Sequence, residues 1–176
     1  FIRFPYELYK NNPYWVPPLE MDEMNTLRKD KNPAFEHCES EYWLAYKDGK
    51  IAGRIAGIIN HLANQKWGEK VRFGWIDFID DYEVVQLLIT TVIEWGKSKG
   101  MKAIHGPLGF NDMDKEGLLV YGFDKLPTIA NIYNYEYYPT HLERFGLTGT
   151  EDWVQYKMVA SQPVPEKVER INALIL

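Results

Sequence analysis

Several features that define large classes of protein are scarce in this sequence. Its 176 residues include one cysteine, Cys38, which excludes an internal disulfide framework and a zinc site built on cysteines. Lys and Arg number 20 against 25 Asp and Glu, a formal charge of −5, whereas nucleic-acid-binding modules usually carry a basic excess. No apolar run reaches the roughly 18 residues of a transmembrane helix, and no signal-peptide pattern is present. We therefore expect a cytoplasmic protein that binds neither nucleic acid nor membrane.

Apolar and aromatic residues are plentiful enough for a folded core. They make up 45% and 15% of the chain, and disordered chains are poor in aromatic residues. The length suits one domain on a prior of roughly 150 residues. We expect residues 1–41 to form an aromatic and proline-rich arm and helix packed on the core. Residues 42–160 then form the main domain, and residues 161–176 start a C-terminal segment that continues further.

A β-hairpin is predicted over residues 42–60. Two strand-like runs flank the tight-turn dipeptide Asp48-Gly49, which favours a two-residue hairpin loop. Gly53 and Gly57 lie in the second run, where they either make room for a close neighbour or mark a bulge.

A strand, a long helix and a short strand follow the hairpin. VRFGWIDFI at 71–79 is rich in aromatic and β-branched residues, and residues 81–99 carry an amphipathic helical pattern that ends before Gly100. A short strand at 101–105 completes a unit whose order predicts a parallel crossover. Weaker patterns predict helices at 5–9, 20–31, 114–121, 136–145 and 166–176, and strands at 129–133 and 153–160.

This order of elements resembles the GCN5-related N-acetyltransferase (acyl-CoA N-acyltransferase) superfamily. The resemblance covers roughly 42–160 and is clearest in VRFGWIDFIDDYEVVQLLITTVIEWGKSKGMKAI and in YYPTHLERFGL. The stretches DGKIAGRIAGIIN and EGLLVYGFD and the loop GPLGFN look like a YghO-like branch of that superfamily. The resemblance implies an α/β (α+β) fold, in which a mixed sheet with splayed central strands is flanked by helices.

The resemblance also implies an acyl-CoA donor, acetyl-CoA or a longer acyl-CoA. In the superfamily, backbone N–H groups at the start of the long helix hold the diphosphate of coenzyme A after a glycine-rich loop. The corresponding residues here, 80–85, contain no glycine and no basic residue. Asn111, in the loop after the short strand, offers a second place for an anion. The implied cofactor-binding residues are Phe78, Ile79, Asp81, Tyr82, Glu83, Val84 and Asn111.

Acyl transfer to an amine needs a base for the amine and an acid for the thiolate leaving group. Asp77 lies on the third strand, where the superfamily often has a carboxylate base, and burial among aromatic residues would favour its uptake of a proton. His105 is the other candidate base. The superfamily's acidic tyrosine is replaced by Leu142, so Tyr137 or Tyr138, one turn earlier, would take that role, with Tyr133 and Tyr135 as further alternatives.

Two functions follow from these residues. The first is an acyl-CoA-dependent N-acyltransferase that acetylates or acylates an unidentified small amine. The alternative is an acyltransferase-like binding domain, catalytically inactive or divergent, that has lost standard coenzyme A diphosphate binding. An aminoacyl-tRNA donor is disfavoured by the acidic balance. The expected partner is the small-molecule amine, and a homodimer is left open.

Overall fold

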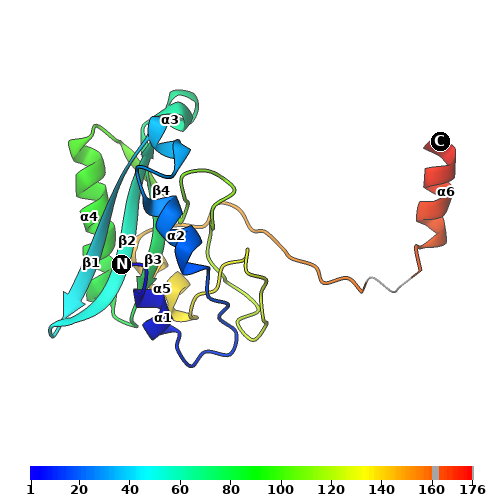
Figure 1. The fold of residues 1–176 in the computed structure, drawn as a ribbon, viewed down its shortest axis with the longest axis horizontal. Coiled ribbons are helices and arrows are strands. Elements are labelled where there is room, and N and C mark those ends of the chain that lie inside the picture. Colours follow the sequence, from blue (N-terminus) through cyan, green and yellow to red (C-terminus); the bar gives the residue numbers. More distant parts are fainter. Residues whose placement is uncertain (160–162, 176) are drawn as a thin grey trace.

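A four-stranded mixed sheet forms the centre of the computed structural model, which describes residues 1–159 and 163–175 (Figure 1). Its strands lie in chain order, and the first two pairs are antiparallel whereas β3 and β4 are parallel. The strands are β1 (Cys38–Lys47), β2 (Lys50–Asn60), β3 (Lys70–Phe78) and β4 (Ala103–His105).

Helices flank this sheet, so the expected α/β architecture, a mixed sheet with helices around it, is confirmed. The long helix α4 packs along one face, while α1 and α2 lie on the other side. The C-terminal helix α6 lies apart from the sheet. The helices are α1 (Phe4–Leu8), α2 (Glu20–Leu27), η1 (Pro33–Glu36, a 3-10 helix), α3 (His61–Trp67), α4 (Tyr82–Ser98), α5 (Tyr137–Phe145) and α6 (Glu166–Ile175).

The predicted hairpin is confirmed, including its turn. Asp48 and Gly49 have φ angles of 51° and 74°, the positive values that a tight hairpin loop requires. β1 begins at Cys38, four residues before the predicted start, because the polar run that precedes Tyr42 pairs with the end of β2. The sequence also missed α3, which Asn60 caps by accepting a hydrogen bond from the backbone N–H of Ala63.

β2 is covered on both faces, and its glycines let α4 approach. A Cβ atom built on Gly53 would lie 2.8 Å from Leu88 Cδ1, and one on Gly57 would lie 3.0 Å from Trp95 Cε3. The expectation that these glycines make room for a neighbour is therefore confirmed. Since side chains alternate along a strand, Arg54 points to the opposite face.

The predicted parallel crossover is confirmed, but its two strands share little length. β3 and β4 pair only through Lys70–Arg72 and Ala103–His105, and after Gly106 the loop adds one more backbone hydrogen bond, from the N–H of Leu108 to the Phe73 carbonyl at 2.7 Å. Within the described residues, no strand lies beside the rest of β3 on that edge. The second half of β3 is therefore open to other partners.

Three predicted elements in the second half of the chain are wrong. The predicted helix 114–121 and strand 129–133 lie in a long loop between β4 and α5, and 153–159 contains no strand; Ala160 lies outside the described residues. Gly117, with a φ of 79°, interrupts the helical pattern. The Asn134 side chain bonds both the N–H and the carbonyl of Leu119, at 2.7 and 3.1 Å, so a side chain takes the place of strand pairing.

Gly96 sets the distance between α4 and the sheet, and we predict that Gly96→Ala destabilises the fold. The added Cβ would lie 2.6 Å from Val71 Cγ1, and overpacking of this kind costs about 1–3 kcal/mol, offset by up to about 1 kcal/mol of helix propensity. Urea unfolding should show a net loss of about 1–2 kcal/mol. Gly149→Ala, which meets nothing within 4 Å, is the matched control, and equal stability of the two variants would contradict this packing.

Cys38 belongs to a small apolar cluster with Ile58 and Phe110, and burial raises the pKa of its thiol to about 11. The unfolded chain ionises near the usual value of 9.0 while the folded protein keeps the proton, so stability is lost as pH rises from about 9 to about 11. We predict that the free energy of unfolding of the wild type falls by about 1.4 kcal/mol per pH unit in this window, relative to Cys38→Ala. Parallel pH profiles of the two proteins would contradict this.

Candidate active site

A bulge in β3 shapes the centre of the molecule. The register between β2 and β3 shifts between Arg54 and Ala56, and Trp75 has a φ of 44°. A positive φ is rare for a bulky residue and stores strain, which is often found at functional sites. The bulge lies in the half of β3 that has no strand beside it on the β4 side. The backbone therefore departs from regular pairing where a ligand could approach it.

Asp77 and Arg54 form a buried ion pair across the two strands. They are direct partners in the β2–β3 register, so their side chains leave the sheet on the same face. Arg54 Nε lies 2.7 Å from Asp77 Oδ2, and the two side chains are 6% and 12% exposed. Asp77 is therefore a carboxylate with a guanidinium counter-charge, not a carboxyl surrounded by aromatic rings alone as the sequence suggested.

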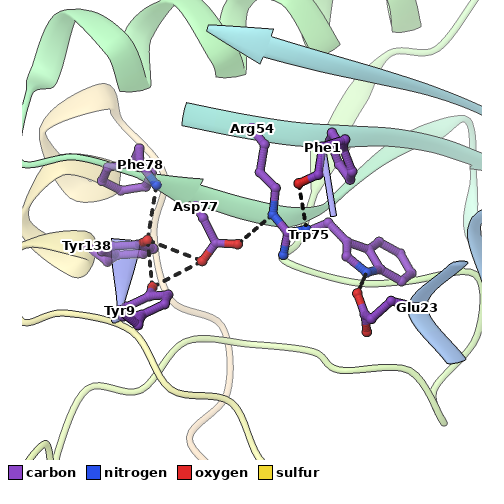
Figure 2. A network of polar contacts seen from close by, with 8 residues as sticks. All are labelled: Phe1, Tyr9, Glu23, Arg54, Trp75, Asp77, Phe78 and Tyr138. Carbon is purple, nitrogen blue, oxygen red and sulfur yellow. Dashed lines mark hydrogen bonds and ion pairs between the residues drawn. The ribbon is translucent and has the colours of Figure 1, made fainter. Parts of the chain in front are cut away.

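Two tyrosine hydroxyls contact the other oxygen of Asp77 (Figure 2). Tyr9, which follows α1, donates to Asp77 Oδ1 at 3.1 Å, and Tyr138 on α5 lies 3.3 Å from the same atom. The two hydroxyls are 2.7 Å apart. Burial and the charge of Asp77 raise the pKa of both tyrosines well above the usual value, so both stay protonated at neutral pH.

α5 fills part of the open edge of β3. The backbone N–H of Phe78 donates to the Tyr138 hydroxyl at 3.1 Å, and the Tyr137 hydroxyl donates to the Phe78 carbonyl at 2.8 Å. The rings of Phe78 and Tyr138 stack with centroids 4.0 Å apart. Leu142, at the position of the superfamily's tyrosine, is buried in the core. The structure thus brings both predicted tyrosines to β3 and places Tyr138 beside Asp77.

A cavity of about 100 Å³ opens beside this cluster. Its walls come from the N-terminal arm, from β2 and β3, from the long loop and from α5. The polar groups and rings that line it include Glu23, Arg54, Trp75, Asp77, Lys115 and Tyr138. Asp77 and Tyr138 can therefore meet a small molecule directly.

The start of α4 does not fit a diphosphate in the superfamily's manner. Asp81 caps the helix itself, accepting a hydrogen bond from the N–H of Glu83 at 2.9 Å, and its other oxygen pairs with Lys47. Asp80 contacts His141 Nε2 at 2.7 Å. Of the implied cofactor residues, Phe78 and Val84 are buried in the core, Ile79 packs against it, and Asp81, Tyr82 and Glu83 form this acidic cap.

His105 and Asn111 lie away from the cluster. His105 ends β4 opposite Arg72, where burial lowers the pKa of its imidazole. Asn111 is exposed, and its side chain accepts a hydrogen bond from the N–H of Met113 in a local turn. Neither residue lines the cavity that Asp77 and Tyr138 share.

Sequence reasoning missed Arg54 and Tyr9. Arg54 had a usable signal, because a charged residue inside the apolar run IAGRIAGII requires a buried counter-charge on a neighbouring strand. Tyr9 had none, since its contact with Asp77 spans 68 residues.

Among the described residues, no group of His, Cys, Asp and Glu side chains is arranged to hold a metal ion. The helices within 1–159 and 163–175 include none with the length and apolar character needed to cross a bilayer.

Comparisons with known proteins find two curated relatives. The chain is 35% identical over 173 residues to protein YghO of Escherichia coli, and 30% identical over 172 residues to a bacterial ceramide synthase of Caulobacter vibrioides. The alignments cover 96% and 97% of this chain but 44% and 45% of those proteins, so the chain spans under half their length. No family model and no solved structure matches it. The chain is therefore homologous to these two proteins.

Arg54 is the buried ion-pair partner of Asp77. We predict that Arg54→Met lowers the free energy of unfolding by about 3–5 kcal/mol, because it leaves a buried carboxylate without its counter-charge. The double variant Arg54→Met/Asp77→Leu should recover most of this loss. Chemical denaturation measures both.

The matched control for this prediction is Arg3→Met, which removes an exposed ion pair with Glu20 and should cost about 1 kcal/mol or less. A loss for Arg54→Met as small as that of the control would show that Asp77 does not depend on Arg54.

Proposed function

We propose that this chain catalyses the transfer of an acyl group from an acyl-CoA thioester to the nitrogen of an amine. The observation that carries the proposal is the buried cluster of Asp77, Tyr9 and Tyr138, which adjoins a cavity and the open edge of β3. Homology supports the same chemistry. One relative is named a ceramide synthase, and ceramide is the amide of a fatty acid and a long-chain amino alcohol.

Asp77 is proposed as the base. An amine that attacks a thioester must lose a proton, and a positioned carboxylate can accept it. Arg54 pairs with Asp77 and fixes Oδ2, leaving Oδ1 on the side of the tyrosines. The C–N bond forms as the C–S bond breaks, and the amine proton passes to Oδ1.

Tyr138 is proposed as the acid. Its raised pKa keeps the hydroxyl protonated until a thiolate leaves, and that thiolate then takes the phenolic proton. The Tyr9 hydroxyl, 2.7 Å from that of Tyr138 and 3.1 Å from Asp77, returns the proton that Asp77 received. Tyr9 gives its own proton to Tyr138 and takes one from Asp77, so all three side chains are restored and the net change is one proton lost by the amine and one gained by the leaving sulfur.

The donor's acyl length and the acceptor belong to the same proposal. We expect an acyl-CoA, with acetyl-CoA as the shortest case and fatty acyl-CoA as the case suggested by the Caulobacter relative. The acceptor is a primary amine. Since the start of α4 does not fit the diphosphate, none of the proposed steps involves that part of the donor.

A binding domain without activity is the second candidate. It is favoured by one observation, the acidic cap of α4 that pairs with Lys47 and contacts His141 where the superfamily binds phosphate. Thermal unfolding separates the two candidates, because a ligand at a hundred times its dissociation constant stabilises the folded state by about 2.7 kcal/mol. No shift with acetyl-, octanoyl- or palmitoyl-CoA at millimolar concentration would exclude the enzyme.

We predict that thiol release from acyl-CoA in the presence of primary amines depends on the cluster. Tyr138→Phe removes one hydroxyl and keeps the ring stacked on Phe78, so the fold should persist while kcat falls roughly a hundredfold. Asp77→Asn should lower kcat by a similar factor and leave the affinity for acyl-CoA unchanged.

Tyr135→Phe is the control for this experiment. Its hydroxyl bonds the Leu8 carbonyl, outside the cluster, so the rate should stay within about twofold of the wild type. Melting temperatures show whether each variant is folded. Wild-type rates in both Tyr138→Phe and Asp77→Asn would remove these residues from the mechanism.

A further inference from the structure

Two charged residues of the cavity have no role in the proposed proton relay. Glu23, Arg54, Asp77 and Lys115 line the cavity, and Arg54 and Asp77 neutralise each other. Within the part of the chain that the structure describes, neither Glu23 nor Lys115 takes part in an ion pair. The cavity therefore offers a ligand one free carboxylate and one free ammonium.

Glu23 is held in place by the strained tryptophan of the bulge. Its Oε2 accepts a hydrogen bond from Trp75 Nε1 at 2.7 Å, as Figure 2 shows. None of the residues of α2 is buried, so this bond, more than packing, fixes the carboxylate at the cavity. The bond uses one oxygen, and Oε1 stays available to a donor such as an ammonium group.

Lys115 reaches the same cavity from the long loop between β4 and α5. Burial lowers the pKa of its ammonium, while the charges of Glu23 and Asp77 act in the opposite direction and that of Arg54 adds to the lowering. These four groups therefore lie within electrostatic reach of one another. Lys115 is exposed as a whole residue and lines the cavity, so its ammonium, which has no paired carboxylate among the described residues, is accessible to an anionic group there.

We propose that Glu23 and Lys115 bind an acceptor carrying both an amino and an anionic group, as an amino acid does. The ammonium group lies on Glu23 and the anionic group on Lys115, and this inference rests on the proposed N-acyl transfer and narrows its acceptor. A cavity of about 100 Å³ is well below the roughly 300–1,000 Å³ of sites that enclose a whole drug-sized ligand, so it suits a head group. The bound ammonium first releases one proton to solvent, and the neutral amine then loses a second proton to Asp77 as the C–N bond forms.

Binding without any acyl donor tests this proposal. Titration calorimetry would compare 2-aminooctanoate with heptylamine, which lacks the carboxylate, and with octanoate, which lacks the amine. We expect 2-aminooctanoate to bind roughly tenfold more tightly than either, because each charged contact is worth about one charge-assisted hydrogen bond. Equal affinity for 2-aminooctanoate and heptylamine, or no binding of any of the three, would overturn the proposal. Acyl transfer to an amine that lacks an anionic group is measured separately, so that failure of this proposal can be told apart from failure of the proposed N-acyl transfer.

Variants of the two residues should divide the ligands by charge. Lys115→Gln should lower the affinity for 2-aminooctanoate roughly tenfold and leave the affinity for heptylamine within about twofold of the wild-type value. The amide oxygen in Glu23→Gln can still accept the hydrogen bond from Trp75. This variant should lower the affinity for both amines and leave the affinity for octanoate unchanged. Lys125→Gln and Glu20→Gln alter exposed residues paired with Asp124 and Arg3, and serve as controls of matched chemistry. An equal loss of affinity in Lys125→Gln or Glu20→Gln, or no loss in Lys115→Gln or Glu23→Gln, would contradict the roles proposed for Glu23 and Lys115.

Discussion

A carboxylate buried on β3 requires a counter-charge and hydrogen-bond donors, and distant segments of the chain converge to provide them. Arg54 comes from the neighbouring strand, Tyr9 follows the first helix, and Tyr138 lies on α5. A buried ion pair contributes little when both partners are compared with apolar residues, yet removing one partner is costly. The pair therefore acts more as a constraint than as a source of stability, because it fixes which parts of the chain must meet. The groups proposed for proton transfer are the same groups that satisfy Asp77.

The open half of β3 explains why α5 lies where it does. A strand edge that is buried without a neighbour must find partners for its N–H and carbonyl groups. β4 pairs with only the first three residues of β3, and at Phe78 the hydroxyls of Tyr137 and Tyr138 replace the missing strand. Side chains are less regular partners than a strand, so the stretch around the Trp75 bulge remains irregular and faces the cavity. The candidate site thus follows from an incomplete sheet.

Local signals predicted much of the framework and little of the site. The hairpin turn, β2, α4 and the crossover follow from turn chemistry and hydrophobic periodicity, which act over short distances. The segment 114–133 misled the same reasoning, because Gly117 and the Asn134 side chain replace regular pairing there. Asp77 and Tyr138 were identified as candidates, but their meeting with Tyr9 and Arg54 depends on contacts separated by 23 to 129 residues. Such contacts leave no periodic trace in a sequence.

The acidic start of α4 is less hostile to an anion than its sequence suggests, and also less available. Asp81 pairs with Lys47, so part of the local charge is balanced, and Asp80 contacts His141. At about 4 Å an unpaired charge would oppose a phosphate by about 1 kcal/mol in water, and by more in a less polar medium. A second obstacle is the backbone, since the N–H of Glu83 already donates to Asp81. A phosphate could use that group only by displacing the cap, which costs about 1 kcal/mol for a typical helix. A thioester donor held by this chain therefore has to gain its affinity along the open edge of β3 and at the cavity beside Asp77.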